Sequence, residues 1–365
     1  MTGLELPPGG QPTQKARYEF YQTSAAIIQR AGLKLYHPEP ENIPDEQKCH
    51  EFIREPLPTD KRKNLLECRL RALCVYIDHR YKTADHMPLL ETALSKKWAY
   101  KSFTRMVEKG ATGSAVVTGP GGISRMFQSH CLSRYCLEYA SDLRELGLFF
   151  QTPRDGMPFI AFCMTELPAE ARRRQSDWVC LLLVTPDFDF RSVLHEDVFP
   201  ADYGRLFPDF MYIPVRLLED QVELIRDGLH GPTESLAQQT ETLLHMNRED
   251  FSTSRKALFE IERTVRQLRD RWRFARELAN TLMRCFAEIV RAHKLEVTAG
   301  SSIDRLYSKV LVQRVQTQIA IVEMMDLDLD SLPSAIQEQH RKVLGFTCSI
   351  RSSQDADVDA RLKQS

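Results

Sequence analysis

The stretch LFEIERTVRQLRDRWRFARELANTLMRCFAEI, residues 258–289, decides the fold of this chain. Apolar side chains recur in it at alternating steps of three and four residues, which places them along one side of a single helix. They are Leu258, Ile261, Val265, Leu268, Trp272, Ala275, Ala279, Leu282, Phe286 and Ile289. A stripe of this kind must be covered by another helix. We therefore predict a long helix over residues 252–293 that carries a helix-pairing seam.

The chain around this helix has helical patterns almost throughout. Two shorter helical segments precede it and are separated near Pro232, because proline interrupts helix hydrogen bonding. After it, residues 303–325 are predicted to run back as a return helix, and Ser331 begins a last helix with Pro333 in its first turn. We predict an antiparallel, coiled-coil-like helical stalk over residues 216–345, followed by a disordered tail over 346–365.

The N-terminal part mixes helical and strand patterns and is predicted to form a head over residues 17–215, after a disordered tail over 1–16. Predicted helices cover 17–31, 61–80, 88–109 and 125–146, and predicted strands cover 114–118, 148–151, 158–164 and 179–184. The aromatic-rich segments near Phe188 and over 207–215 are predicted to be sheet edges. The predicted fold class is α+β: a head with a small antiparallel sheet covered by helices, then the helical stalk.

The composition favours a soluble, intracellular chain. Apolar residues make up 42% of the 365 residues and charged residues 27%, with a formal net charge of −1, so there is no overall attraction to nucleic acid or acidic lipid. No window approaches the ~18 consecutive apolar residues of a membrane helix, and the N-terminus lacks the pattern of a signal peptide. Nine cysteines without a CxxC pair fit a reducing compartment. We expect a cytoplasmic location and no membrane span.

The segments RWRFARELANTLMRCFAEI (271–289) and RVQTQIAIVEMMDLDLDSLPSAIQEQHRKVL (314–344) resemble the stalk of fungal CorA-like proteins, relatives of magnesium channels. The shared pattern is L-x-x-L-P-x-x-I-x-x-Q, matched by Leu329, Leu332, Pro333, Ile336 and Gln339. The resemblance implies a soluble head followed by long stalk helices. Transporters of the family end in two membrane helices joined by a Gly-Met-Asn turn. The sequence has neither, so conduction is not carried over.

Carboxylates gather at Asp326, Asp328 and Asp330, and hard cations prefer oxygen ligands. In an extended segment, however, alternate residues point to opposite sides, and no glycine turn or distal glutamate completes an EF-hand. We favour a solvated acidic linker. Magnesium enters only as what the family resemblance implies, and we expect no other cofactor.

Two further patterns are interpreted in the same way. The loop Gly119-Pro120-Gly121-Gly122 lacks the Lys-Ser/Thr of a phosphate-binding loop, so a tight surface turn is favoured. The cysteine and histidine residues near Cys49 and Cys131 lack paired zinc-ligand spacing, so buried thiols are favoured. No catalytic or cofactor-binding residue is predicted.

The long helix carries many arginines, and such a helix can lie along phosphates. Acidic residues, among them Glu260, Glu262 and Asp270, are interleaved with these arginines three or four positions away. This spacing favours ion pairs within the helix, so we do not expect a nucleic-acid partner.

The leading hypothesis is a non-enzymatic, cytoplasmic interaction or scaffold protein. It would resemble the soluble part of fungal CorA-like proteins, and would self-associate or bind a protein partner through residues 251–325. Two alternatives stay open. One is a truncated divalent-cation (magnesium) transporter, and the other is an accessory enzyme of small-molecule metabolism with its site between head and stalk.

Overall fold

The computed structural model describes residues 17–22, 46–55, 70–77, 83–118, 146–155, 158–167, 177–193, 211–244, 250–296 and 304–362. Its elements are β1 (Arg17–Gln22), α2 (Glu46–Arg54), β2 (Leu70–Tyr76), η1 (Thr83–His86), α3 (Met87–Ser95), α4 (Lys101–Lys109), β3 (Gly113–Thr118), β4 (Leu146–Gln151), β5 (Ile160–Leu167), β6 (Asp177–Val184), α5 (Phe190–Val193), α6 (Tyr212–Leu244), α7 (Asp250–Glu296) and α8 (Asp304–Leu362). The predicted α+β class is confirmed.

The strands form one six-stranded sheet in the order β1-β2-β6-β5-β4-β3. Neighbouring strands are antiparallel except β2 and β6, which are parallel with Leu70 opposite Trp178 and Tyr76 opposite Val184. The prediction of an antiparallel sheet is therefore wrong for this central pair. The two strands are far apart in sequence, so a long connection can return the chain in the same direction.

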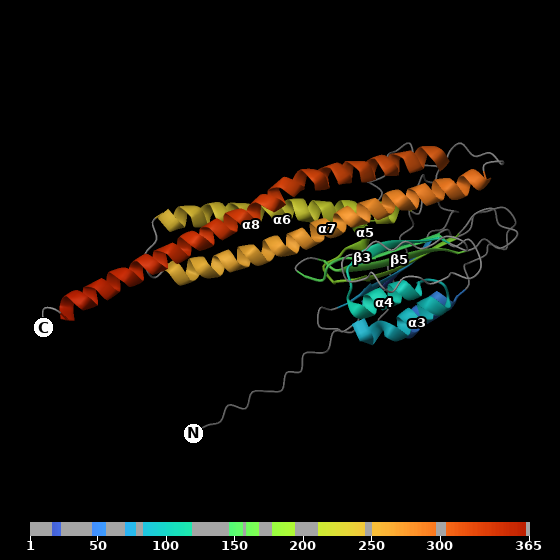
Figure 1. Ribbon diagram of the computed structural model, residues 1–365. Coiled ribbons are helices and arrows are strands. Elements are labelled where there is room, and N and C mark those ends of the chain that lie inside the picture. Colours follow the sequence, from blue (N-terminus) through green and yellow to red (C-terminus); the bar gives the residue numbers. More distant parts are fainter. Residues whose placement is uncertain are drawn as a thin grey trace, which may run out of the picture.

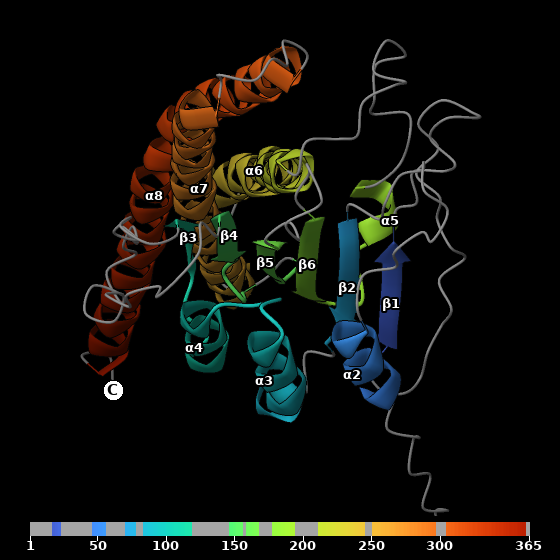
Figure 2. The ribbon, with the colours of Figure 1, turned by 90° about the vertical axis from the view of Figure 1, so that its right-hand side faces the viewer.

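Helices cover both faces of the sheet (Figures 1 and 2). The helices α2, α3 and α4 lie on one face, while α6 and α7 lie on the other, with α8 outermost against them. Adjacent residues of β4 enter different cores, because successive strand side chains point to opposite faces. Phe149 meets Phe103 of α4, with ring centroids 6.1 Å apart, and Phe150 meets Phe162 and Phe274 on the α7 side.

The predicted helices over 17–31 and 61–80 are wrong where the structure describes them. Residues 17–22 form the edge strand β1, and 70–76 form β2. All side chains from Ala72 to Ile77 are buried, because helices cover both faces of this strand. A strand buried on both faces has continuous apolar residues instead of alternation, and its spacing was compatible with a helix.

The predicted helix over 88–109 is two helices, α3 and α4, with residues 96–100 between them. Lys97 has a positive φ of 62° in this connection, and Gly110 ends α4 in the left-handed conformation. The four predicted strands over 114–118, 148–151, 158–164 and 179–184 are confirmed as β3, β4, β5 and β6. The predicted helix over 125–146 lies almost wholly outside the described residues.

The C-terminal helices are longer than predicted. The segment near Pro232 does not separate two helices, because α6 runs unbroken from Tyr212 to Leu244, and residues 212–215 are its first turn instead of a sheet edge. Likewise α8 contains Pro333 and continues through residues 346–362, which were predicted to be a disordered tail. Leu332 and Ile336 are buried on either side of Pro333, so packing holds the helix where propensity would end it.

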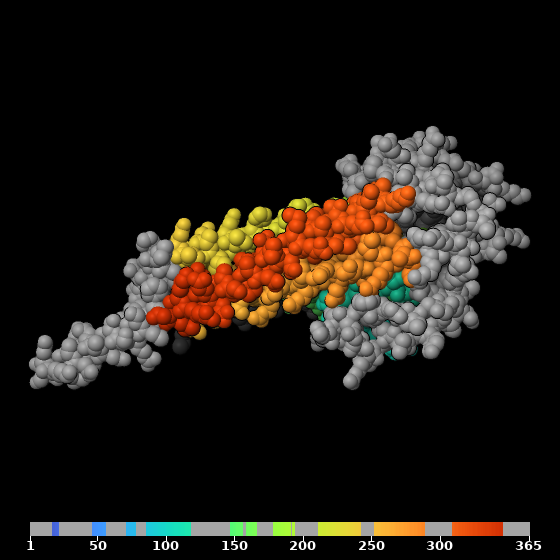
Figure 3. All heavy atoms as spheres, turned by 45° about the horizontal axis from the view of Figure 1, so that its top comes forward, coloured from blue at the N-terminus to red at the C-terminus, as the bar shows by residue number. Residues whose placement is uncertain are grey.

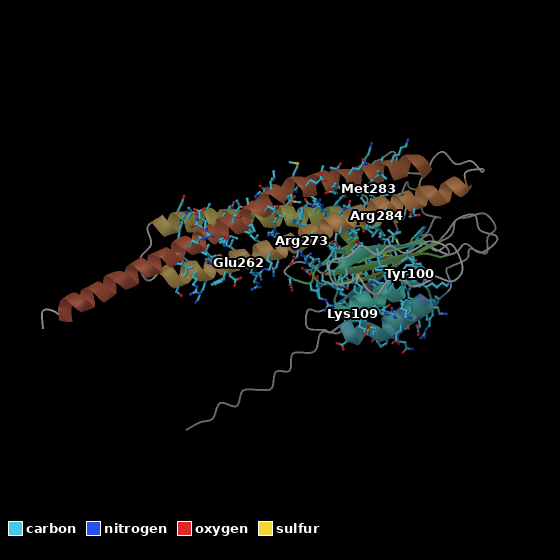
Figure 4. All side chains as sticks on the ribbon, viewed as in Figure 1. Tyr100, Lys109, Glu262, Arg273, Met283 and Arg284 are labelled. Atoms are coloured by element: carbon cyan, nitrogen blue, oxygen red, sulfur yellow. The ribbon has the colours of Figure 1, made fainter. Side chains whose placement is uncertain are left out.

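A glycine in β4 is required by close packing of the layer beneath. A Cβ built on Gly147 would lie 2.1 Å from the hydroxyl oxygen of Tyr100, the residue that precedes α4. Figure 4 shows Tyr100 beside the sheet on the α4 side. No larger residue fits at this position unless the Tyr100 ring moves.

Candidate helix-pairing surface

The seam predicted on α7 is buried inside the chain's own fold. The buried members are Leu258, Ile261, Val265, Leu268, Ala275, Ala279, Leu282 and Phe286. Trp272 is partly buried against the same core, and the side chain of Ile289 lies outside the described residues. The seam joins α7 to α6, α8 and the sheet of the same chain. Pairing with a second protein stays a prediction, and it would have to use other faces of the helices.

Hydrogen bonds fix how α8 lies against its two neighbours. The indole Nε1 of Trp272 donates to the carbonyl oxygen of Val322 at 2.7 Å, so this member of the seam is covered by α8. The amide Nε2 of Gln339 donates to Oγ1 of Thr240 in α6 at 2.9 Å. Directional bonds at two separate points resist sliding of α8 along the bundle.

A buried arginine joins α7 to the sheet and to α6. The guanidinium of Arg271 donates to the carbonyl oxygens of Pro153 at 3.1 Å and Pro158 at 3.3 Å, and to Oε1 of Gln221 at 3.0 Å. Burial lowers the pKa of Arg271 to about 10, against the opposing influence of Asp187 and Asp155. Sequence reasoning missed this residue, although it lies three positions after Leu268 and four before Ala275, within the apolar stripe.

Ion pairs connect α6 with α8 near the sheet. Nε of Arg314 donates to Oε1 of Glu219 at 2.7 Å, and its second nitrogen bonds the other carboxylate oxygen. Asp220 pairs with Arg216 at 3.1 Å within α6. Burial raises the pKa of Asp220 to about 6, because desolvation outweighs the attraction of Arg216.

The raised pKa of Asp220 leads to a pH-dependent prediction. The folded chain binds this proton more tightly than the unfolded chain, so stability falls as pH rises from about 4 to about 6. Asp220→Asn removes this dependence. Relative to the wild type, Asp220→Asn should therefore be more stable at about pH 7 than it is at about pH 4. We expect this relative free energy of unfolding to rise by about 2 kcal/mol between the two pH values.

Urea titrations at the two pH values measure this difference, and Asp270→Asn is the matched control because Asp270 is an exposed carboxylate on α7. An Asp220→Asn effect that is equal at both pH values would contradict the prediction.

A buried carboxylate lies in the edge strand β1. Glu19 accepts hydrogen bonds from the hydroxyls of Tyr21 and, at 2.8 Å, Tyr76, and from the guanidinium of Arg17. Burial alone would raise the pKa of Glu19, but these hydrogen bonds outweigh it and lower the pKa. The alternation Arg17, Glu19, Tyr21 is the sequence signal for this cluster, and a helical interpretation of the segment hides it.

The face of α8 that points away from the bundle exposes large apolar side chains. Met324 is 75% exposed and Leu327, one turn later, is 80% exposed, while Leu344 is 56% exposed further along the same helix. On α7, Phe259 is half exposed but packs near the ring of His340, with ring centroids 5.3 Å apart. The apolar surface most open to another molecule in this part of the chain is therefore on α8.

The prediction that the three candidate metal ligands lie in an extended segment is wrong. Asp326, Asp328 and Asp330 lie in the helix α8 and not in an extended linker. Asp330 pairs with Arg269 of α7 at 2.8 Å. Within the described ranges no group of three or more His, Cys, Asp or Glu side chains could hold a metal ion. Magnesium binding stays an implication of the family resemblance alone.

Of the glycine loop and the two cysteine and histidine clusters, the structure describes only the residues near Cys49. The loop 119–122 and the cluster at Cys131 lie outside the described residues. Cys49 is buried, as expected, and Nδ1 of His50 lies 2.8 Å from Oγ1 of Thr92. A structural role is enough to explain both.

The arginines of α7 form the intrahelical ion pairs that their spacing predicts. Arg263 pairs with Glu260 at 3.5 Å, Arg266 with Glu262 at 3.2 Å, and Arg273 with Asp270 at 3.3 Å. These arginines are exposed, but their charge is balanced locally.

These observations define the class as an α+β protein with a six-stranded mixed sheet and a helical C-terminal part. Over the described residues no helix is long and apolar enough to cross a membrane. No protein-family model and no curated protein matches the sequence.

Among solved structures, the chain is similar to the full-length CmaX protein, with a TM-score of 0.39 and 12% identity over 94% of this chain and 83% of that chain. It is also similar to the ZntB cytoplasmic domain from Vibrio parahaemolyticus RIMD 2210633, with a TM-score of 0.31 and 9% identity. That match covers 74% of this chain and 88% of the other. Both TM-scores lie below one half, and we infer no function from these likenesses.

Proposed function

We propose that this chain is a cytoplasmic interaction or scaffold protein that binds a protein partner through its C-terminal helices and resembles the soluble part of CorA-like proteins. The observation that carries the proposal is the exposed apolar pair Met324 and Leu327 on α8. Transfer of apolar side chains from water into a contact is favourable, so a partner helix would bury them at a gain. Exposed apolar surface on one face is typical of a protein-protein contact.

The way the CorA-like pattern packs supports the same proposal. Leu329, Leu332, Ile336 and Gln339 are all buried between α8 and the neighbouring helices. The spacing that carries the resemblance is thus the inner face of a packed stalk helix. The outer face of that helix stays available for a partner. We therefore propose that the partner-binding region continues beyond the predicted residues 251–325 toward residue 344.

Site-specific photo-crosslinking tests the proposal. A photoreactive amino acid replaces Met324 on α8, and in a control variant it replaces Glu260, which is exposed on α7. We expect a covalent protein adduct from position 324 in cells and none from position 260, because only the first position lies on the outer face of α8. If neither position gives an adduct, or both give the same one, the proposed function is wrong.

A further inference from the structure

The outer face of α8 carries a stripe that we call the α8 stripe. Its members are Leu327, Asp330, Ser334, Gln337, Arg341 and Leu344. They follow one another at steps of three, four, three, four and three residues, which is the spacing of a helix-pairing face. All six are exposed. The buried residues of this helix, such as Leu329 and Ile336, lie on its other side.

The α8 stripe is chemically self-complementary when it is read in the opposite direction. Leu327 then corresponds to Leu344, Asp330 to Arg341, and Ser334 to Gln337. Two such helices, related by a two-fold axis between Ala335 and Ile336, would form two leucine contacts and two carboxylate–guanidinium pairs. A parallel arrangement would instead place Asp330 against Asp330 and Arg341 against Arg341, which like-charge repulsion disfavours.

We propose that the α8 stripe binds the same stripe of a second copy of this chain, antiparallel, about a two-fold axis. The inference rests on the proposed function, because it names the partner of the same helix face. A two-fold interface uses one patch on both molecules, and such a patch must be complementary to itself. The pairing of aspartate with arginine across the axis meets this requirement.

The position of α8 in the molecule permits this approach. Figure 3 shows α8 lying across the front of the bundle with its outer face uncovered. Its packing partners are α6 and α7, and the sheet lies on their far side (Figure 2). The stripe is about 26 Å long at ~1.5 Å per residue. A contact of this size is small, and we expect a dissociation constant in the micromolar range.

Asp330 is already oriented for the contact. Its Oδ1 accepts a hydrogen bond from Arg269 at 2.8 Å, although the side chain is 63% exposed. A carboxylate has further lone pairs on its second oxygen, so it can accept a bond from Arg341 of a second copy at the same time. Holding the carboxylate in place reduces the entropy lost when the pair forms.

Charge reversal with sedimentation analysis of the full chain tests the inference. Asp330→Arg and Arg341→Asp should each weaken self-association about tenfold or more, because each places like charges opposite one another twice. An equimolar mixture of the two variants should recover the wild-type affinity, since both pairs in the mixed dimer are again opposite in charge. The double variant should also recover it. Arg273→Asp is the control: Arg273 is 60% exposed on α7, outside the stripe (Figure 4), and its reversal should change the affinity less than about twofold.

The recovery in the mixture is a result that a role in folding alone cannot produce. A wild-type chain that stays monomeric up to about 100 µM overturns the inference, as does a mixture that associates no better than either variant. The same crosslinking from position 327, which belongs to both the exposed apolar pair and the α8 stripe, separates this failure from failure of the proposed function. An adduct with a different protein and none with a second copy would leave the proposed function standing and exclude the dimer.

Discussion

Replacing Arg271 with alanine is expected to lower the free energy of unfolding by about 3–4 kcal/mol. The guanidinium donates to two backbone carbonyls of the β4–β5 connection and to Gln221 of α6. Its loss leaves the buried Gln221 oxygen and two partly buried carbonyls without their donor, and it opens a cavity where α7, α6 and the sheet meet. The measurement is urea unfolding monitored by circular dichroism.

Arg273→Ala is the matched control, two residues along the same helix and exposed. Its effect should stay within about 0.5 kcal/mol, because surface ion pairs contribute little. Arg271→Lys should lie between the two, since a single ammonium group cannot reach three acceptors as a planar guanidinium does. If Arg271→Ala lowers the free energy of unfolding no more than Arg273→Ala does, Arg271 does not stabilise the contact of α7 with α6 and the sheet.

The sequence predicted some elements and missed others, and the difference lies in the local signals around each one. The strands β3 to β6 follow turn residues and have strand-like composition, so their patterns identified them. The strands β5 and β6 are buried on both faces like β2 and also lack alternation, but turn residues bound them. The strand β2 was missed because the apolar spacing of Leu66, Leu70, Leu73 and Ile77 also fits a helix that begins earlier in the sequence. The long helix α7 was predicted because one side of it is apolar, but α6 and α8 continue through prolines that local propensity would make their ends.

The helix-pairing surface, too, could be predicted only in part from the sequence. The spacing of Leu258 to Phe286 identifies a face that must be covered, but it does not tell whether another chain or the same chain covers it. In the structure the covering residues come from α6, from α8 residues such as Val322 and from the sheet. Those contacts depend on where the chain folds back, which no local pattern encodes. The exposed face of α8 could be recognised only from the structure, which shows which side of this helix is buried.

The buried carboxylate of β1 is the second site where a single substitution should have a large effect. Glu19→Gln is expected to lower the free energy of unfolding by about 2–3 kcal/mol near neutral pH. The substitution keeps the shape but removes the charge that Arg17 and the hydroxyls of Tyr21 and Tyr76 stabilise. One of the two acceptor oxygens also becomes an amide nitrogen that cannot accept a bond from a hydroxyl.

The destabilisation by Glu19→Gln should depend on pH, and the direction follows from the pKa of Glu19. The pKa of Glu19 is lower in the folded chain than the ordinary value of 4.5, so its ionised form stabilises the fold above that value. This stabilisation is lost as pH falls through the folded pKa, and the difference between wild type and Glu19→Gln should shrink in the same range. Urea titrations from neutral to acidic pH measure it, with Glu51→Gln, an exposed residue of α2, as the control. A difference that grows toward acidic pH would show that Glu19 is protonated in the folded chain and that burial outweighs its hydrogen bonds.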